Sequence, residues 1–181
     1  ITAYGVRETL GSGDAGGVRV TVNGLEAQVL AVENIDGQER VRVVIPQVIR
    51  SPTAIVVSRD GVASAPAFVA VHEVQPAIFA FDSGDAVVVR YPGNTLVTAA
   101  DPVAAGGIVY FYANGLGSAP ETTRVTIGGA ECEVFYAGPA PGLPGVSQIN
   151  VRLAAGVPPG RQEMRLTIGG AVSPAVTMAL R

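Results

Sequence analysis

The side chains with the chemistry for proton transfer or metal binding are few in this chain. His72 is the only histidine, and it stands between Val71 and Glu73 in an apolar run. A neutral imidazole is a general base and a common metal ligand. With no second histidine and no nucleophile nearby in the sequence, His72 is expected to be a polar residue at a strand edge or between domains.

Three carboxylates surround one expected hairpin: Asp82, Asp85 and Asp101. Calcium takes several oxygen ligands, often from loops. The Asp-Ser-Gly-Asp run at 82–85 lacks the spacing of a complete calcium loop. Solvated turns are therefore the expected role of these residues, and a calcium site stays open as the alternative.

Composition excludes several kinds of covalent and phosphate chemistry. All 12 basic residues are arginine. The missing lysine amine rules out Schiff-base catalysis, a P-loop and a Lys–Asn isopeptide cross-link. A Gly-x-Ser-x-Gly nucleophile elbow is also absent from the sequence. We expect no enzyme, and assign no catalytic, cofactor-binding or metal-binding residue.

The strongest signal in the chain is an internal repeat. Residues 19–29 (RVTVNGLEAQV) and 124–134 (RVTIGGAECEV) are identical at 6 of 11 positions. Two further pairs of segments correspond in the same order: 41–46 with 149–154, and 54–64 with 163–173. A repeat of this length is a whole small domain. We predict a first module over residues 1–75 and a second over 76–181, meeting near Gln75–Phe79.

Short alternating strands and glycine-rich turns indicate the fold class. Asn23-Gly24, Asp60-Gly61 and Gly128-Gly129 are tight-turn signals between apolar runs. Apolar residues do not recur with a helical period. The pattern predicts an all-β chain of tandem immunoglobulin-like β-sandwich domains. The expected strands and hairpins are 1–6, 18–32, 39–46, 54–64, 67–74, 86–97, 108–117, 123–134, 147–153, 162–168 and 176–181.

The aromatic residues favour packing over ligand binding. Tyr110, Phe111 and Tyr112 are consecutive, so the two tyrosines lie on one face of a strand and Phe111 on the other. We expect a core face and a partly covered face. A carbohydrate platform commonly includes tryptophan, and the sequence has none. Tyr136 is expected to pack under the loop at 137–146.

Charge and cysteine content narrow the partners. The net charge of −3 is spread over both halves without a basic stripe, so nucleic acid is not expected. Cys132 is the only cysteine and alternates with Glu131 and Glu133, which predicts a small buried residue without a disulfide. Apolar runs are too short for a membrane-spanning helix.

One family resemblance emerges from the second half. Its motifs are, in chain order, GGIVYFYANGLG, RVTIGG, YAGPAPGLPGVSQINVR, GVPPG and LTIGGAVSP. With Pro76–Phe79 as its opening, residues 76–181 resemble the Solibacter-type C-terminal β-sandwich domain of large secreted Acidobacteria proteins. The first module resembles a generic IPT/TIG immunoglobulin-like domain. The resemblance implies an extracellular or cell-surface, non-enzymatic module.

The leading hypothesis is a structural or interaction module for surface assembly or adhesion. Its partners would be other protein subunits, through self-assembly included, or an extracellular polymer. The alternative is a carbohydrate-binding accessory module of a secreted hydrolase. The ligand, the oligomeric state and what precedes Ile1 are left open by the sequence.

The modules differ at their beginnings. About 28 residues, 80–107, precede the repeated strands of the second module, whereas the first begins at Ile1, without methionine. We expect a processed product or an excised fragment. The nearly uncharged Ile1–Val6 strand is then either an edge whose preceding strands were removed, or one that another chain completes by strand addition, which builds filaments.

Overall fold

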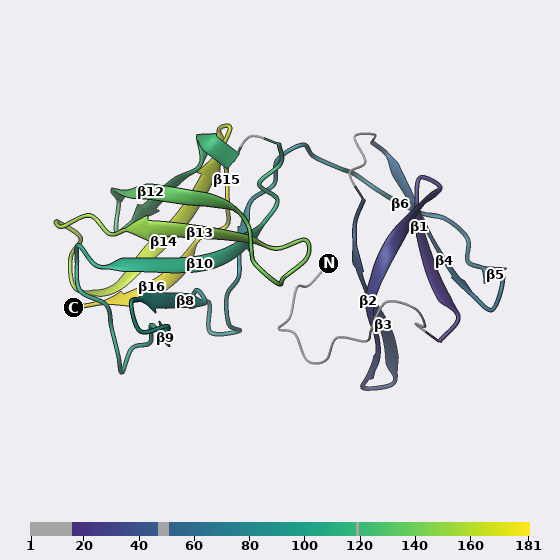
Figure 1. Cartoon of the computed structure of the whole chain (residues 1–181), viewed down its shortest axis with the longest axis horizontal. Coiled ribbons are helices and arrows are strands. Elements are labelled where there is room, and N and C mark those ends of the chain that lie inside the picture. The colour runs from purple at the N-terminus through teal and green to yellow at the C-terminus, as the bar shows by residue number, and fades with distance from the viewer. Residues whose placement is uncertain (1–15, 47–50, 119) are drawn as a thin grey trace. The chain divides into compact units, whose positions relative to one another are not determined.

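A computed structural model describes residues 16–46, 51–118 and 120–181 (Figure 1). The predicted all-β fold class is confirmed. The described residues contain no α-helix, only the short 3₁₀ turn η1 (Pro120–Thr122), and therefore no helix that could span a membrane. The chain divides into two compact units, Ile1–His72 and Glu73–Arg181.

The first unit has six strands among its described residues. They are β1 (Val18–Val22), β2 (Leu25–Ile35), β3 (Gln38–Val44), β4 (Thr53–Arg59), β5 (Val62–Ala63) and β6 (Ala67–Val69). All pairs are antiparallel, in the order β3-β2-β1-β4-β5, with β6 also on β4. The strand β3 ends this order and pairs only with β2 among the described strands.

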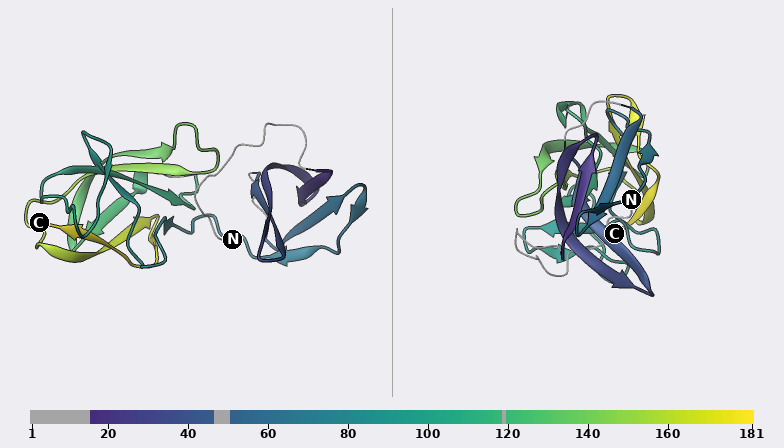
Figure 2. Two further views of the ribbon diagram at one scale, coloured as in Figure 1. Left: turned by 90° about the horizontal axis from the view of Figure 1, so that it is seen from below. Right: turned by 90° about the vertical axis from the view of Figure 1, so that its right-hand side faces the viewer.

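The second unit is a complete two-layer sandwich. Its strands are β7 (Ala77–Ile78), β8 (Val88–Tyr91), β9 (Thr95–Leu96), β10 (Ile108–Asn114), β11 (Arg124–Ile127), β12 (Ala130–Pro139), β13 (Ser147–Arg152), β14 (Gly160–Ile168), β15 (Ala171–Val172) and β16 (Val176–Leu180). One layer holds β7, β8, β9, β10, β13 and most of β12, and the other holds β11, β14, β15 and β16. Figure 2 shows the two layers edge-on.

Strand β12 belongs to both layers. Its first residues pair with β11 in one layer, and from Glu133 onward it pairs with β13 in the other. A bulge between Val134 and Tyr136 leaves Phe135 as the extra residue. Bulges increase local twist and bend a strand, which lets β12 pass from one layer to the other.

The units share one strand plan, so their positions can be matched. Strands β1 to β5 of the first unit correspond to β11 to β15 of the second, and β6 corresponds to β16. The bulge recurs in β2 at the matching place, between Val29 and Ala31. A smaller device recurs as well: Ser64 Oγ accepts a hydrogen bond from Val57 N (3.2 Å), and Ser173 Oγ accepts one from Leu166 N (3.0 Å).

Among the residues that the structure describes, only those of the second unit form a large core. Its buried cluster is built around Phe111, Ile127, Met164 and Leu166, all 0% exposed. The buried cluster of the first unit consists of Val20, Val22 and Ala27. The shared hairpins are therefore covered by apolar neighbours in one unit and incompletely covered in the other.

The turns lie where the sequence places them, and some strand ends do not. Asn23-Gly24 and Gly128-Gly129 have positive φ at both residues, as a tight hairpin turn requires. Strand β12 runs to Pro139, so the loop expected from 137 begins later. The expected strand 67–74 ends at Val69. The Ile1–Val6 prediction lies outside the described residues.

Candidate functional site

The most unusual feature of the first unit is a set of inward-pointing apolar side chains that stay partly exposed. We name this set the open face. Its members are Val41, Val43, Ile45, Ile55, Val57 and Val69. Several of them pack against Val20 and Val22, so they point toward the core and not to the outer surface.

Register identifies the counterpart of each member in the second unit. Val20 lies opposite Val57, as Val125 lies opposite Leu166. Val57 is 36% exposed, and Leu166 is 0% exposed.

Other members of the open face repeat this difference. Ile45 is 41% exposed, against 2% for the matching Leu153. Val69 is 37% exposed, and the matching Met178 is 2% exposed. Equivalent positions are therefore buried in one unit and accessible in the other.

The second unit shows what covers these positions. Residues between Ile78 and Leu116 form much of the buried cluster. Within that segment β10 pairs along the whole length of β13, from Ile108 opposite Arg152 to Ala113 opposite Ser147. In the first unit, β3 takes the place of β13, and the described residues provide no strand in the place of β10.

Charged side chains lie around the open face and are not members of it. Arg42 Nη2 donates to both oxygens of Glu33 at 2.7 Å on the outer side of β2 and β3. Arg59 is paired with Glu39, which links β4 to β3. Arg59 matches the fully buried Ile168 of the second unit, so a position that is apolar in the complete sandwich carries an ion pair here.

The predicted calcium candidates are engaged in other contacts. Asp85 Oδ1 accepts hydrogen bonds from Arg161 Nε (2.9 Å) and Thr177 Oγ1 (2.7 Å). Ser83 Oγ donates to Asp85 Oδ2 at 2.9 Å. These hydrogen bonds, that of Thr177 first, lower the pKa of Asp85. The Asp-Ser-Gly-Asp turn is thereby attached to β14 and β16.

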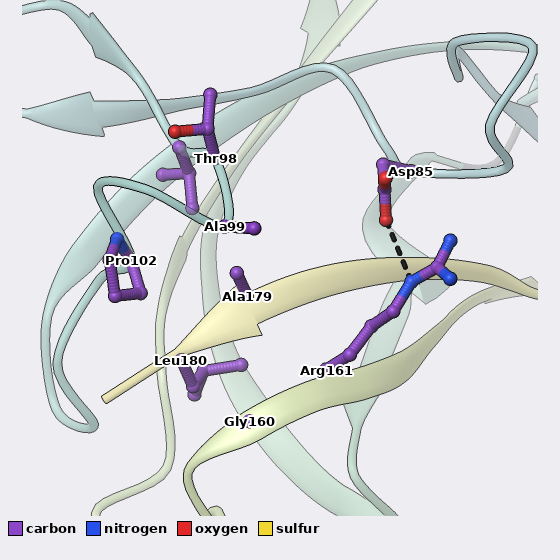
Figure 3. A pocket seen from close by; sticks show the side chains of 9 residues that line it. Asp85, Thr98, Ala99, Pro102, Gly160, Arg161, Ala179 and Leu180 are labelled. Carbon is purple, nitrogen blue, oxygen red and sulfur yellow. Dashed lines mark hydrogen bonds and ion pairs between the residues drawn. The ribbon is translucent and has the colours of Figure 1, made fainter.

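The ion pair of Arg161 with Asp85 lies at one end of a shallow hollow of about 380 Å³ (Figure 3). Small apolar side chains, among them Ala99, Pro102 and Ala179, line the rest of it. Figure 3 shows the guanidinium of Arg161 held against Asp85 and directed away from Pro102. The polar groups of this hollow serve the fold, and we assign it no ligand.

Asp101 lies apart from Asp85 and has its own arginine. Arg90 donates to Asp101 Oδ1 at 3.0 Å and to Asp101 Oδ2 at 3.1 Å. The hydrogen bond from Arg90 is the main cause of the lowered pKa of Asp101. Within the described ranges, no three His, Cys, Asp or Glu side chains gather as metal ligands would.

His72 is an exposed residue beyond the end of β6, so its predicted place within a strand was wrong. The β-ladder of β6 with β4 ends at Val69 opposite Thr53. Cys132 is buried, as the alternation predicted, and burial raises the pKa of its thiol.

The predicted partition of residues 110–112 between the two faces of a strand is confirmed. Phe111 is 0% exposed, and Tyr110 and Tyr112 lie on the other face of β10, with ring centroids 6.0 Å apart. Tyr136 lies against Gly138 and donates from its hydroxyl to the carbonyl oxygen of Pro139 at 2.7 Å. Sequence reasoning missed Phe135, because only the register of β12 shows that it is the bulge residue.

Comparisons with known proteins found similar solved structures and nothing else. No family model matches the chain, and no curated protein matches it. A mixed-linkage glucan utilization protein, SGBP-B, of Bacteroides ovatus, solved with a heptasaccharide, is 15% identical over 91% of this chain and 36% of its own, with a TM-score of 0.37.

Two further structures are made of repeated domains. A tandem of titin immunoglobulin domains is 8% identical over 91% of this chain and 80% of its own, with a TM-score of 0.28. Domains of the surface layer protein SbsC are 15% identical over 95% of this chain and 23% of their own, with a TM-score of 0.26. No function is transferred from likenesses at this level.

Proposed function

We propose that this chain is a non-catalytic extracellular or cell-surface module whose first unit is completed by a strand from another polypeptide. The observation that carries the proposal is the difference between matched positions, Val57 at 36% and Leu166 at 0% exposed. An added strand that covers these partly exposed valine and isoleucine side chains would stabilise the complex by about 25 cal/mol per Å² of apolar surface buried.

The edge of β3 that does not pair with β2 supplies the backbone groups that an added strand would bind. Strand addition uses main-chain hydrogen bonds for affinity and alternate side chains for register. In the second unit, β13 carries out this pairing with β10 over six residue pairs, from Ile108–Arg152 to Ala113–Ser147. The proposed donor binds β3 antiparallel, in the same way.

The donor that we propose is a second copy of this chain. Its segment 1–7, ITAYGVR, occupies the place in the repeat that IVYFYAN, residues 108–114, occupies in the second unit. Like β10, it begins with isoleucine and carries no charge before its last residue. Donation from one copy to the next is a head-to-tail contact that does not close, so it grows a filament.

Light scattering on the full chain at rising concentration tests the proposal. We expect particle mass to rise with concentration and to be little affected by salt, because few charges lie at the contact. Val43→Lys places a charge on the open face and is expected to leave the chain monomeric. Val62→Lys is the matched control, because Val62 is 76% exposed on β5.

A chain that stays monomeric at high concentration contradicts strand donation between copies. Association that Val43→Lys and Val62→Lys reduce equally also contradicts it, because the contact then does not depend on the open face. Circular dichroism of each variant checks that the strand content is retained.

A further inference from the structure

A second surface, distinct from the open face, also differs between the two units. It is the outward face of β10, β12 and β13 in the second unit, and we name it the tyrosine–amide face. Its members are Tyr110, Tyr112, Tyr136, Gln148 and Asn150.

Strand register places these five side chains in two adjacent rows. Tyr110, Asn150 and Tyr136 lie opposite one another in the first row. Tyr112 and Gln148 lie opposite one another in the second. Directly paired residues of a sheet point to the same face, and neighbouring strands are about 4.8 Å apart. The tyrosines of β10 and β12 therefore flank the amides at a separation of roughly 10 Å.

The matched face of the first unit is charged. Arg42 lies opposite Ala31 there, as Asn150 lies opposite Tyr136 in the second unit. Arg42 donates hydrogen bonds to Glu33. In the second unit the position of Glu33 is occupied by Gly138, two residues after Tyr136. A partly buried ion pair is thus replaced by an amide, a tyrosine and a glycine on the same strands.

The glycine at position 138 allows the ring of Tyr136 to lie close to the backbone of β12. A Cβ on Gly138 would come within 3.1 Å of the Tyr136 hydroxyl and 3.3 Å of its Cζ. The hydroxyl is held by the carbonyl oxygen of Pro139 at 2.7 Å, while the side chain stays 39% exposed. A ring fixed in this way loses little conformational entropy when a ligand stacks on it.

The amides have hydrogen-bonding capacity left over. Gln148 Nε2 donates to Asn150 Oδ1 at 2.8 Å. That bond orients both groups and leaves the Asn150 amide nitrogen and the Gln148 carbonyl oxygen directed to other partners. An amide nitrogen can donate two hydrogen bonds and a carbonyl oxygen can accept two. Neither row contains a charged side chain.

A hollow of about 320 Å³ continues this face past the edge of β12. Phe135, 52% exposed, and Tyr136 line it from β12, and Glu121 and Thr123 line it from the segment before β11. Thr123 is 8% exposed, and its hydroxyl has no hydrogen-bond partner in the described structure. Because that oxygen is itself buried, the exposed side chains of Phe135 and Tyr136 are the part of the hollow that a ligand would contact.

We propose that the tyrosine–amide face and this hollow bind a strand of neutral polysaccharide. Sugar rings present C–H groups to an aromatic face and hydroxyls to amides, which is the combination found here. A docked protein would need about 20–30 residues a side with an apolar centre, whereas this face is small and rich in polar groups. The absence of charge from both rows disfavours a polyanion.

Affinity electrophoresis of the full chain through gels containing hydroxyethylcellulose, arabinoxylan, galactomannan or polygalacturonate tests this site. We expect retardation by at least one of the neutral polymers and none by polygalacturonate. Tyr136→Ala and Asn150→Ala should each weaken binding by about tenfold or more, as central contacts of an interface do. Arg42→Ala, at the position in the first unit that matches Asn150, should bind like the parent.

Retardation by polygalacturonate alone, or by none of the polymers, overturns the proposal. So does retardation that both substitutions leave unchanged, or that Arg42→Ala removes. Asn150→Asp keeps the size of the side chain, so equal folding of this variant with lost binding separates recognition from stability. The open face plays no part in this readout, so the result is independent of strand donation.

Discussion

Val57 and Leu166 occupy the same place in the two units, each opposite a buried valine of the neighbouring strand, yet Val57 is 36% exposed and Leu166 is fully buried. The two positions share hairpin, register and hydrogen-bonded serine. They differ in whether the described residues of the unit supply an opposing layer.

Truncation of Leu166 and truncation of Val57 should have unequal effects on the free energy of unfolding. Leu166→Ala should cost about 2–5 kcal/mol of unfolding free energy, because it opens a cavity in a closed core. Val57→Ala should cost less than about 1 kcal/mol in the monomer, since little packing is lost. Urea titration followed by NMR, with peaks from each unit read separately, measures both. Equal costs would contradict an uncovered first unit.

The two serines form a matched pair for a second prediction. Ser173 is 2% exposed, and its hydroxyl accepts from Leu166 N and donates to Pro174 O at 2.9 Å. Ser173→Ala leaves a buried amide without its acceptor and should cost about 1–3 kcal/mol. The hydroxyl of Ser64 makes the same bonds at an exposed site. Ser64→Ala should therefore cost under about 1 kcal/mol, as thermal unfolding can measure.

How far the sequence predicts this protein depends on whether a feature is local. Asn23-Gly24 and Gly128-Gly129 set their turns by backbone preference, so both hairpins were predictable. The partition of Tyr110 and Phe111 follows from strand alternation in the same way. Exposure of Val57 was not predictable, because it depends on neighbours that are remote in sequence.

The tyrosine–amide face shows the same limit. Tyr136 and Asn150 meet only because a bulge at Phe135 shifts the register of β12 by one residue. The prediction of a strand over residues 67–74 was wrong for a different reason. The apolar run continues to Val71, but β4 begins at Thr53, where its ladder with β6 ends.

Acid sensitivity of the second unit should depend on Asp85. Its pKa is lowered in the folded protein, chiefly by the hydrogen bond from Thr177. A lowered folded pKa contributes stability that is present above the unfolded pKa, near 3.9, and is lost as pH falls through the folded value. Asp85→Asn should therefore flatten the fall in melting temperature below about pH 4. An unchanged acid limb would contradict the assigned contacts.

The thiol of Cys132 should react slowly in the folded protein. Burial raises its pKa, so little thiolate forms near neutral pH, and the side chain is 5% exposed. A disulfide reagent such as DTNB should label it quickly only after denaturation. Fast labelling of the native chain, with β11 and β12 intact by NMR, would contradict this placement.

Amide hydrogen exchange of β3, at low and high protein concentration, tests the central claim most directly. Strand donation between copies predicts that those amides of Gln38–Val44 that do not point to β2 exchange fast in dilute solution and become protected as concentration rises. The matching strand β13, already paired on both sides, should stay protected throughout. Protection of β3 that does not change with concentration, whether high or low, would contradict completion of the first unit by a second copy.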